Sequence, residues 1–366
     1  MRVLILNDGK TGGGAETVFS ETSHLMKGMK EELIVKASTP YDGMLSTVVN
    51  GFGLVNFPYT LVVAWHAVRF RPHIIHIHNY IYRISPLPIL MLKLLKKVLD
   101  FSVIYTAHDF HLVCPNSGLF RHVGEGKFEA CTLCVQSTTW HNVVSNNCDR
   151  RGLLFSLIRY IRHKVCYDWL SLHETFDLVI CPSEFLRAAL KQKFPNLKTQ
   201  LLRNPSFVQN EVGRSQATYP LPSSKVIAYF GRLTPEKGVL QYIEEKYDPL
   251  EYQEFLIYGE GEQRDAILAM IEKKDLSKHV YLMGRIPQAE VGKAMGQINA
   301  IVLPSLCLEN CPLVVCDALK LGKEVVSREI GGAGELMALA QDAELEFLEV
   351  PVYLADLMGI YKSVCG

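Results

Sequence analysis

Short apolar runs alternate with amphipathic segments along almost the whole chain. Runs bounded by Gly, Pro or polar residues predict strands, and helical spacing appears between several of them. The expected strands lie at residues 3–7, 32–37, 74–78, 102–107, 178–181 and 200–202, and then at 226–230, 255–258, 280–283, 300–303 and 324–327. Strands that alternate with helices form parallel sheets covered on both faces. The pattern therefore predicts an α/β protein with doubly wound sheets.

The periodic pattern is interrupted between residues 206 and 224, and this stretch contains prolines. Such a stretch favours an interdomain linker. It separates an N-terminal domain at residues 1–205 from a C-terminal domain at 206–350, and a last helical pattern follows at 351–366. The 366 residues are enough for two ordinary domains. A content of 48% hydrophobic and 21% charged residues is that of a globular protein and excludes a disordered chain.

The segment at 300–322 has the strongest candidate chemistry. A buried strand is followed by a polar turn, and Pro312 suits the first position of a helix. Glu309 lies just before this helix and Asp317 lies within it. Free N–H groups at the helix start, at Leu313 and Val314, favour an anion such as a diphosphate, as does the helix dipole. An acid beside a phosphate site indicates sugar-nucleotide chemistry. The alternative is an ordinary strand–loop–helix unit with a solvated Glu309.

Two further loops of the second half follow predicted strands. Arg232 and Lys237 come after the strand at 226–230, where two cations can hold a diphosphate leaving group. The alternative is that both cations are simply solvated. Gly259 and Gly261 follow the strand at 255–258 and let a base or ribose approach the backbone closely.

The first half has two candidate sites at strand ends. Gly13 and Gly14 follow the first strand, but Thr17 leaves the G-x-G-x-x-G motif incomplete. These glycines fit a donor-binding loop and a tight turn equally well. His108 follows the strand at 102–107, and ligands bind at the carboxyl ends of parallel strands. We expect His108 to contact substrate, the alternative being a polar residue that merely leaves a strand.

Together these motifs resemble the retaining family-4 glycosyltransferases, also called glycosyl transferases group 1. That family has the GT-B fold, in which two Rossmann-like domains face each other across a cleft and a last helix packs back on the first domain. The segment at 300–322 resembles the Glu-x7-Glu signature, with Asp317 one methylene shorter than the second Glu. Residues 231–238 are similar to the donor-phosphate signature, and residues 331–335 resemble the Gly-Gly-x-x-Glu turn. The resemblance covers nearly the whole chain.

The resemblance implies a hexosyltransferase that uses a UDP- or GDP-linked sugar and retains anomeric configuration. The acceptor would be a hydroxyl of a glycan or glycolipid in lipopolysaccharide or exopolysaccharide synthesis. Glu309 and His108 would act at the sugar, Arg232 and Lys237 at the diphosphate, and Asp317 at the ribose. No catalytic cofactor and no nucleic-acid partner are expected. A sugar-nucleotide epimerase and a non-catalytic nucleotide-sugar binder are the alternatives.

Four of the ten cysteines gather in an insertion at about residues 109–150, with the spacing C-x16-C-x2-C-x13-C. Four thiolates with one C-x2-C knuckle fit a tetrahedral structural zinc site. Reduced free cysteines and an iron–sulfur centre are the alternatives. The four residues are Cys114, Cys131, Cys134 and Cys148.

The formal net charge is zero, but it is unevenly distributed. Residues 1–205 carry 23 Lys and Arg against 15 Asp and Glu, and residues 206–366 carry 15 against 23. Basic amphipathic patterns at 87–101 and 151–172 fit peripheral contact with a membrane as well as they fit core helices with a solvated edge. No export signal or spanning segment is apparent. We therefore expect a cytoplasmic protein, peripheral on the inner face of the cytoplasmic membrane.

Overall fold

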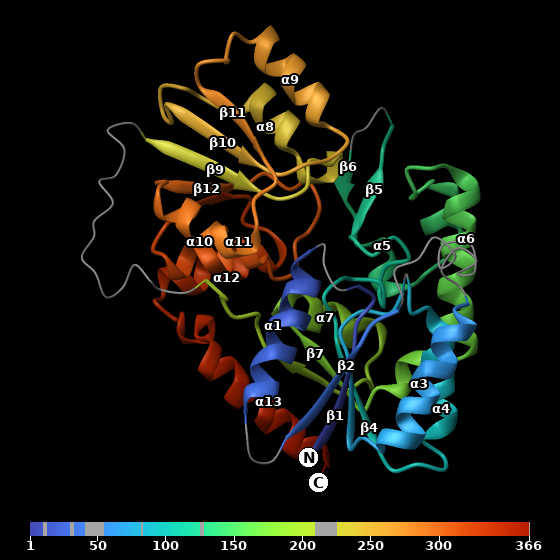
Figure 1. The fold of residues 1–366 in the computed structure, drawn as a ribbon. Coiled ribbons are helices and arrows are strands. Elements are labelled where there is room, and N and C mark those ends of the chain that lie inside the picture. The colour runs from blue at the N-terminus through green and yellow to red at the C-terminus, as the bar shows by residue number, and fades with distance from the viewer. Residues whose placement is uncertain are drawn as a thin grey trace. The chain divides into compact units, whose positions relative to one another are not determined.

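The structure is a computed structural model that describes residues 1–9, 13–29, 33–40, 55–81, 83–124, 128–208 and 225–365 (Figure 1). The chain divides into two compact units, each described here by itself. The first unit comprises Met1–Leu119, Cys131–Arg203 and Pro351–Gly366. The second comprises Phe120–Ala130 and Asn204–Val350. This division assigns residues 120–130 to the second unit, whereas the sequence analysis placed the whole insertion in the first domain. The expected linker lies, from residue 209 to 224, outside the described residues.

A six-stranded sheet forms the centre of the first unit, and all its neighbouring strands pair in parallel. Its order is β2-β1-β3-β4-β7-β8. The strands are β1 (Arg2–Leu6), β2 (Ile34–Ser38), β3 (Ile74–Ile77), β4 (Ser102–Thr106), β7 (Leu178–Cys181) and β8 (Thr199–Leu201).

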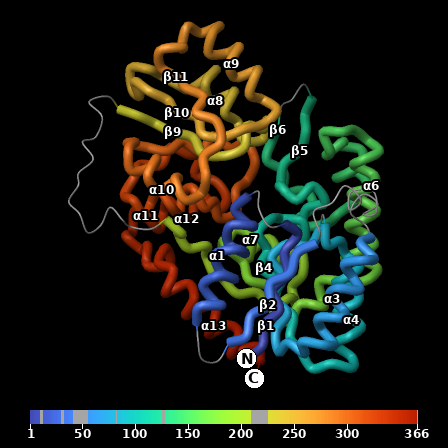
Figure 2. Tube along the Cα trace, in the orientation of Figure 1, coloured from blue at the N-terminus to red at the C-terminus, as the bar shows by residue number. Residues whose placement is uncertain are grey.

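Helices α1 (Gly14–Gly28) and α13 (Val350–Cys365) pack on one face of this sheet. Alternate strand residues such as Val3, Ile5 and Ile104 meet buried side chains of both helices there, among them Phe19 and Leu357. The last helix of the chain therefore belongs to the core of the first unit, as the trace in Figure 2 lets the reader follow.

The remaining helices of the first unit include a neighbouring pair, α3 (Phe57–Phe70) and α4 (Pro86–Leu95), which lie side by side in both views (Figures 1 and 2). The insertion and the segments after it form short helices and helical turns. These are α5 (Leu133–Gln136), η2 (His141–Ser145), α6 (Leu153–His163), η3 (Lys164–Trp169), η4 (Leu172–Thr175) and α7 (Glu184–Lys193).

The second unit is built on a five-stranded parallel sheet of order β11-β10-β9-β12-β13. Its strands are β9 (Val226–Phe230), β10 (Glu254–Tyr258), β11 (Val280–Gly284), β12 (Ala300–Leu303) and β13 (Glu324–Ser327). Residues of the insertion form the antiparallel pair β5 (Phe120–His122) and β6 (Phe128–Ala130).

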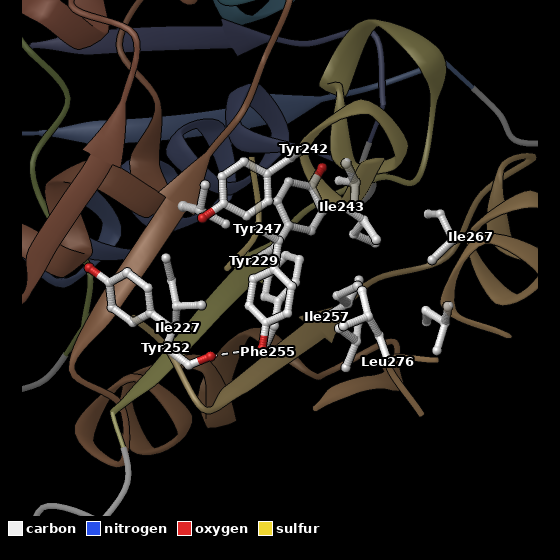
Figure 3. Close-up of a cluster of buried hydrophobic side chains, with 14 of the residues drawn as sticks. Ile227, Tyr229, Tyr242, Ile243, Tyr247, Tyr252, Phe255, Ile257, Ile267 and Leu276 are labelled. Atoms are coloured by element: carbon white, nitrogen blue, oxygen red, sulfur yellow. Dashed lines mark hydrogen bonds between the residues drawn. The ribbon is translucent and has the colours of Figure 1, made fainter. Parts of the chain in front are cut away.

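Both faces of the second sheet are covered. Ile227 and Tyr229 of β9 face one core, shown in Figure 3, with side chains of α8 (Val239–Glu245) and α9 (Arg264–Lys273). Val226 and Ala228, one residue out of phase, face a second core with α10 (Gln288–Gly296), α11 (Leu313–Lys320) and α12 (Gly331–Gln341). The alternation follows from the two-residue period of a strand.

The doubly wound parallel architecture predicted from the sequence is confirmed in both sheets. Two helical predictions were too long. The pattern at 87–101 ends as α-helix at Leu95, because the chain then makes tighter turns in which Lys97 and Val98 donate to carbonyls three residues back. The pattern at 151–172 is divided into α6 and the wider turn η3.

Candidate donor-binding site

The parallel second sheet brings the loops after β9, β10 and β12 to one edge, because the carboxyl ends of parallel strands coincide. The loops after β9 and β10 run together: the Leu233 N–H donates to the carbonyl of Glu260 at 2.9 Å. Gly259 is needed at this approach. A β-carbon there would overlap the carbonyl oxygen of Gly231. Gly261 meets the same restriction against the carbonyl of Leu233.

The loops after β9 and β12 are also joined. Gly238 has a φ of 69°, and a β-carbon on it would overlap the carbonyl of Pro304. Next to it, the N–H of Leu306 donates to the carbonyl of Glu236 at 2.8 Å. These contacts hold the short helical turn Pro235–Lys237 (η6) against the turn that precedes α11.

Glu309 lies at the junction of these loops. Its Oε1 is 2.6 Å from Nζ of Lys237 and accepts a hydrogen bond from Oγ of Ser305 at 2.5 Å. The Glu309 side chain is only 16% exposed. Burial opposes the charged form of this carboxylate. This effect of burial is outweighed by the neighbouring Lys237, Ser305 and Arg232, which hold the pKa of Glu309 below its ordinary value. Glu309 is therefore ionised at neutral pH.

Arg232 is the exposed cation of the cluster. Its side chain is 67% exposed, and its guanidinium is 3.9 Å from Glu236. The hydroxyl of Tyr229 donates to the backbone carbonyl of Arg232 at 2.7 Å and fixes the loop. Lys237 differs, since Glu309 holds its ammonium in a buried pair and raises its pKa against the effect of burial. The structure thus gathers Arg232, Lys237 and Glu309 on one unit.

Helix α11 begins next to this cluster. It starts at Leu313 after Pro312, and no side chain caps its N-terminus. Leu313 and Val314 therefore occupy the helix start where backbone N–H groups lack an intrahelical acceptor. One residue later than predicted, Leu313 takes the first helical position.

Asp317 of α11 is engaged within the protein. It accepts a hydrogen bond from Oγ of Ser206 at 2.7 Å and further bonds from the N–H groups of Phe207 and Val208. Burial raises its pKa to about 6, although Ser206 acts in the opposite direction. The ribose contact expected for Asp317 stays a prediction. Here its carboxylate fastens residues 206–208 to α11.

Sequence reasoning missed two residues of this site and the contact made by a third. Ser305 donates to Glu309, Ser206 donates to Asp317, and Gly332 donates its N–H to the carbonyl of Glu309 at 2.8 Å. Gly331 and Gly332 were expected in a turn, but they begin α12. The contact of Ser305 could have been predicted from the sequence, because Ser305 lies four residues before Glu309 in the same loop. The contact of Ser206 joins residues 111 apart and leaves no local signal.

The first unit contains the other predicted site residues. His108 follows β4, and its Nε2 is 2.9 Å from Nδ1 of His78. Burial lowers the pKa of His108 to about 4, with Asp109 acting against it. His108 is therefore a neutral imidazole at physiological pH. Gly13 and Gly14 are exposed at the start of α1, and Gly13 is its N-terminal cap. The donor-binding role expected for both glycines stays a prediction.

The basic side chains expected at a membrane surface mostly bind protein groups. Nζ of Lys93 donates to the carbonyls of Leu170 and Ser171, and Nζ of Lys96 pairs with Asp177 at 2.7 Å. Arg159 pairs with Asp149, and both Arg162 and His163 are buried. Among the described residues, no helix is long and apolar enough to span a bilayer. The charge argument for lipid contact at these two segments is therefore weaker than the sequence indicated.

A protein-family model matches the second unit. Residues 216–346 fit the family described as glycosyl transferases group 1. This part of the chain is similar to the glycosyl transferases group 1. The match includes Arg232, Lys237, Glu309 and Asp317, so it supports the glycosyltransferase prediction at the level of this group.

Two related proteins share about a quarter of the aligned residues with this chain. An uncharacterized 42.6 kDa protein of the cps region of Klebsiella pneumoniae is 24% identical over 281 residues, which are 76% of this chain and 62% of that protein. An uncharacterized glycosyltransferase of Methanocaldococcus jannaschii is 26% identical over 190 residues, which are 48% of this chain and 44% of that protein. The chain thus matches less than two thirds of the length of each.

Solved structures share the fold over nearly the full length. Sucrose-phosphate synthase from Thermosynechococcus elongatus has a TM-score of 0.65 at 14% identity and covers 99% of this chain and 98% of its own. WaaG, a glycosyltransferase involved in lipopolysaccharide biosynthesis, has a TM-score of 0.58 at 12% identity, with 97% and 92% covered. Anabaena HepE in complex with UDP-glucose has a TM-score of 0.57 at 16% identity, with 100% and 95% covered. The GT-B fold predicted from the sequence is confirmed.

Proposed function

We propose that the protein is a retaining hexosyltransferase that moves a sugar from a UDP- or GDP-linked donor to a hydroxyl of a glycan or glycolipid. The acceptor would belong to a lipopolysaccharide or exopolysaccharide pathway. This proposal extends the similarity of residues 216–346 to the group 1 glycosyltransferases. It is supported above all by the single cluster formed by Arg232, Lys237 and Glu309.

The cluster suits a departing diphosphate. Negative charge develops on the leaving group in the transition state, and cations placed in advance stabilise it there. Arg232 offers an exposed guanidinium, whose planar fork matches phosphate oxygens. Lys237 is already oriented by Glu309, so little side-chain freedom would be lost when a phosphate binds beside it. The open N-terminus of α11 adds N–H donors for an anion.

Glu309 would orient the donor sugar through hydrogen bonds to its hydroxyl groups. An ionised carboxylate accepts such bonds strongly, and the lowered pKa keeps Glu309 in that form. His108 of the first unit is a proposed substrate contact, and as a neutral imidazole it can either donate or accept a hydrogen bond. The cations and the helix start would do the electrostatic work at the phosphate, so the proposed mechanism uses no metal ion.

The acceptor class is supported by similarity and by an exposed surface. The relative from Klebsiella pneumoniae is encoded in a cps region, and WaaG acts in lipopolysaccharide biosynthesis. In the first unit, α3 exposes four large apolar side chains at helical spacing: Phe57, Leu61, Trp65 and Val68. A helix face of this kind, with Lys36 over the ring of Trp65, suits the interface of a membrane that holds a glycolipid. We propose peripheral attachment through this face.

A radiolabelled transfer assay tests the function. Purified protein would be incubated with each of a panel of UDP- and GDP-sugars and a bacterial lipid extract, and the products separated from the donor. We expect one donor to label an acceptor, with retained anomeric configuration by NMR of the product. Conversion of the donor without acceptor would instead indicate an epimerase, and donor binding without turnover would indicate a binding protein.

Variants connect the activity to the cluster. Arg232→Ala and Glu309→Gln should each lower turnover at least about a hundredfold, the effect of losing one preorganised transition-state contact. Lys273→Ala is the matched control, because Lys273 is an exposed cation at the end of α9 in the same unit. Equal activity of Arg232→Ala and Lys273→Ala would contradict the leaving-group assignment.

A further inference from the structure

Four cysteines converge on one region of the first unit from four separate points of the chain. Cys114 follows the loop after β4, Cys131 follows β6, Cys134 lies in α5, and Cys148 follows η2. All four are free thiols, and all except the partly exposed Cys131 are buried. Cys134 and Cys148 belong to one small apolar cluster with Val143 and Val144.

Hydrogen bonds fasten these segments to one another. The N–H of Cys131 donates to the carbonyl of Leu119 at 2.7 Å, which closes the base of the β5–β6 hairpin. Nδ2 of Asn116 donates to the carbonyl of Cys148 at 3.0 Å, and this bond joins the loop at Cys114 to the end of the insertion. Hydrogen bonds therefore hold the segments that carry the four cysteines together without any bond between the sulfur atoms.

Lys193 provides a second fastening. Its ammonium donates to the carbonyls of Val113 and Cys134, at 2.9 and 2.8 Å, and to Oγ1 of Thr138 at 2.6 Å. Lys193 ends α7, against which α5 packs (Figure 1). A half-buried cation is thus placed between two cysteine segments. Its charge would offset part of the charge of ionised thiols.

Backbone groups also approach one of the sulfur atoms. The backbone N–H groups of Leu119 and Asn116 both donate toward the sulfur of Cys114. The sulfur of Cys134 lies within electrostatic reach of the sulfurs of Cys114, Cys131 and Cys148.

We propose that Cys114, Cys131, Cys134 and Cys148 bind one structural Zn²⁺ ion that organises the insertion. Zinc accepts four thiolates in a tetrahedron with Zn–S distances of about 2.3 Å. Binding would release the four thiol protons to solvent and leave a site of charge −2, which Lys193 partly offsets. Since the four sulfurs fill the coordination sphere, no position is open for a substrate or water.

The sulfur atoms must draw together when zinc binds. Within the part of the chain that the structure describes, no three His, Cys, Asp or Glu side chains already stand in metal-ligand geometry. Zinc binding would therefore require the cysteine side chains to move, while the hydrogen bonds described above hold their backbone segments. The ion would then pin both ends of the loop between Cys114 and Cys131, which begins six residues after His108. This inference does not depend on the proposed catalytic reaction.

Metal analysis of the full-length protein, purified without a metal-affinity step, tests the proposal. We expect about one zinc ion per chain, as for other four-cysteine sites. Cobalt substitution should give the absorption of a tetrahedral thiolate complex. Wild-type protein without metal and with all four thiols open to alkylation would overturn the proposal. Iron together with inorganic sulfide would also overturn it, in favour of an iron–sulfur centre.

Variants locate the ion. The double variant Cys131→Ser/Cys134→Ser should lose zinc, whereas Cys166→Ser should keep it, because Cys166 is a buried cysteine of the same unit outside the cluster. Zinc retained by the double variant would overturn the assignment. If that variant does not fold, the metal content of the wild-type protein still decides. Glu309→Gln should keep its zinc while losing transfer activity, which separates this proposal from the proposed function.

Discussion

The buried pair of Lys237 and Glu309 gives the sharpest prediction about stability. Replacing Lys237 with Met keeps most of the side-chain volume but leaves the carboxylate of Glu309 without its ammonium partner. Removing one member of a buried ion pair costs about 3–5 kcal/mol. The lower end applies here, because Ser305 still donates to Glu309 and the carboxylate is 16% exposed. We therefore expect Lys237→Met to destabilise the second unit by about 3 kcal/mol.

Scanning calorimetry measures this loss. In a domain of this size each kcal/mol shifts the unfolding temperature by about 2–4 °C, so the transition of the second unit should fall by about 6–12 °C. The double variant Lys237→Met/Glu309→Gln should recover most of the loss, because no buried charge remains unpaired. It should still be inactive. An unchanged transition in Lys237→Met, or a double variant no more stable than the single one, would refute this account of the pair.

Three other predictions concern separate parts of the molecule. The pKa of Asp317 is raised to about 6 in the folded protein, so folding favours the protonated carboxyl group. This contribution to stability is fully present below the ordinary carboxyl pKa and is lost as the pH rises through 6. Asp317→Asn should remove this dependence and gain up to about 3 kcal/mol at pH 7, measured by urea unfolding from pH 4 to 7; an unchanged pH slope would count against the raised pKa. Gly259→Ala should cost about 1–3 kcal/mol, because its β-carbon overlaps the carbonyl of Gly231, whereas Gly296→Ala meets nothing within 4 Å and should be neutral; equal stabilities would disprove the close approach. Trp65→Ser, at a side chain 57% exposed, should weaken cosedimentation with vesicles that contain anionic lipid, and undiminished cosedimentation would exclude α3 as the contact.

The strands were the most predictable part of the fold. Those at 178–181, 226–230, 300–303 and 324–327 begin and end at the residues expected from the sequence. Each is a short apolar run bounded by polar residues, Gly or Pro, so local chemistry decides its limits. The end of α4 at Leu95 was not predictable, because apolar and basic residues continue in helical register while tertiary contacts of Lys93 and Lys96 fix the following turns.

The gathering of Arg232, Lys237 and Glu309 could be inferred because all three follow strands of one parallel sheet. What the sequence could not supply was the partner of each charge. The pairing of Lys237 with Glu309 joins residues 72 apart, and the Ser206 contact of Asp317 depends on how the chain crosses α11. Those contacts are set by tertiary packing, and no periodicity in the sequence reports them.

Titration calorimetry with UDP and GDP tests the central claim most directly, since it needs no acceptor. The account predicts that one of them binds the wild-type protein. Arg232→Ala should then weaken that binding at least about tenfold, a loss of about 1.4 kcal/mol for a charge-assisted contact, whereas Lys273→Ala should bind as the wild type does. Binding of neither nucleotide, or equal binding by Arg232→Ala and the wild type, would contradict a diphosphate site at the Arg232–Lys237–Glu309 cluster.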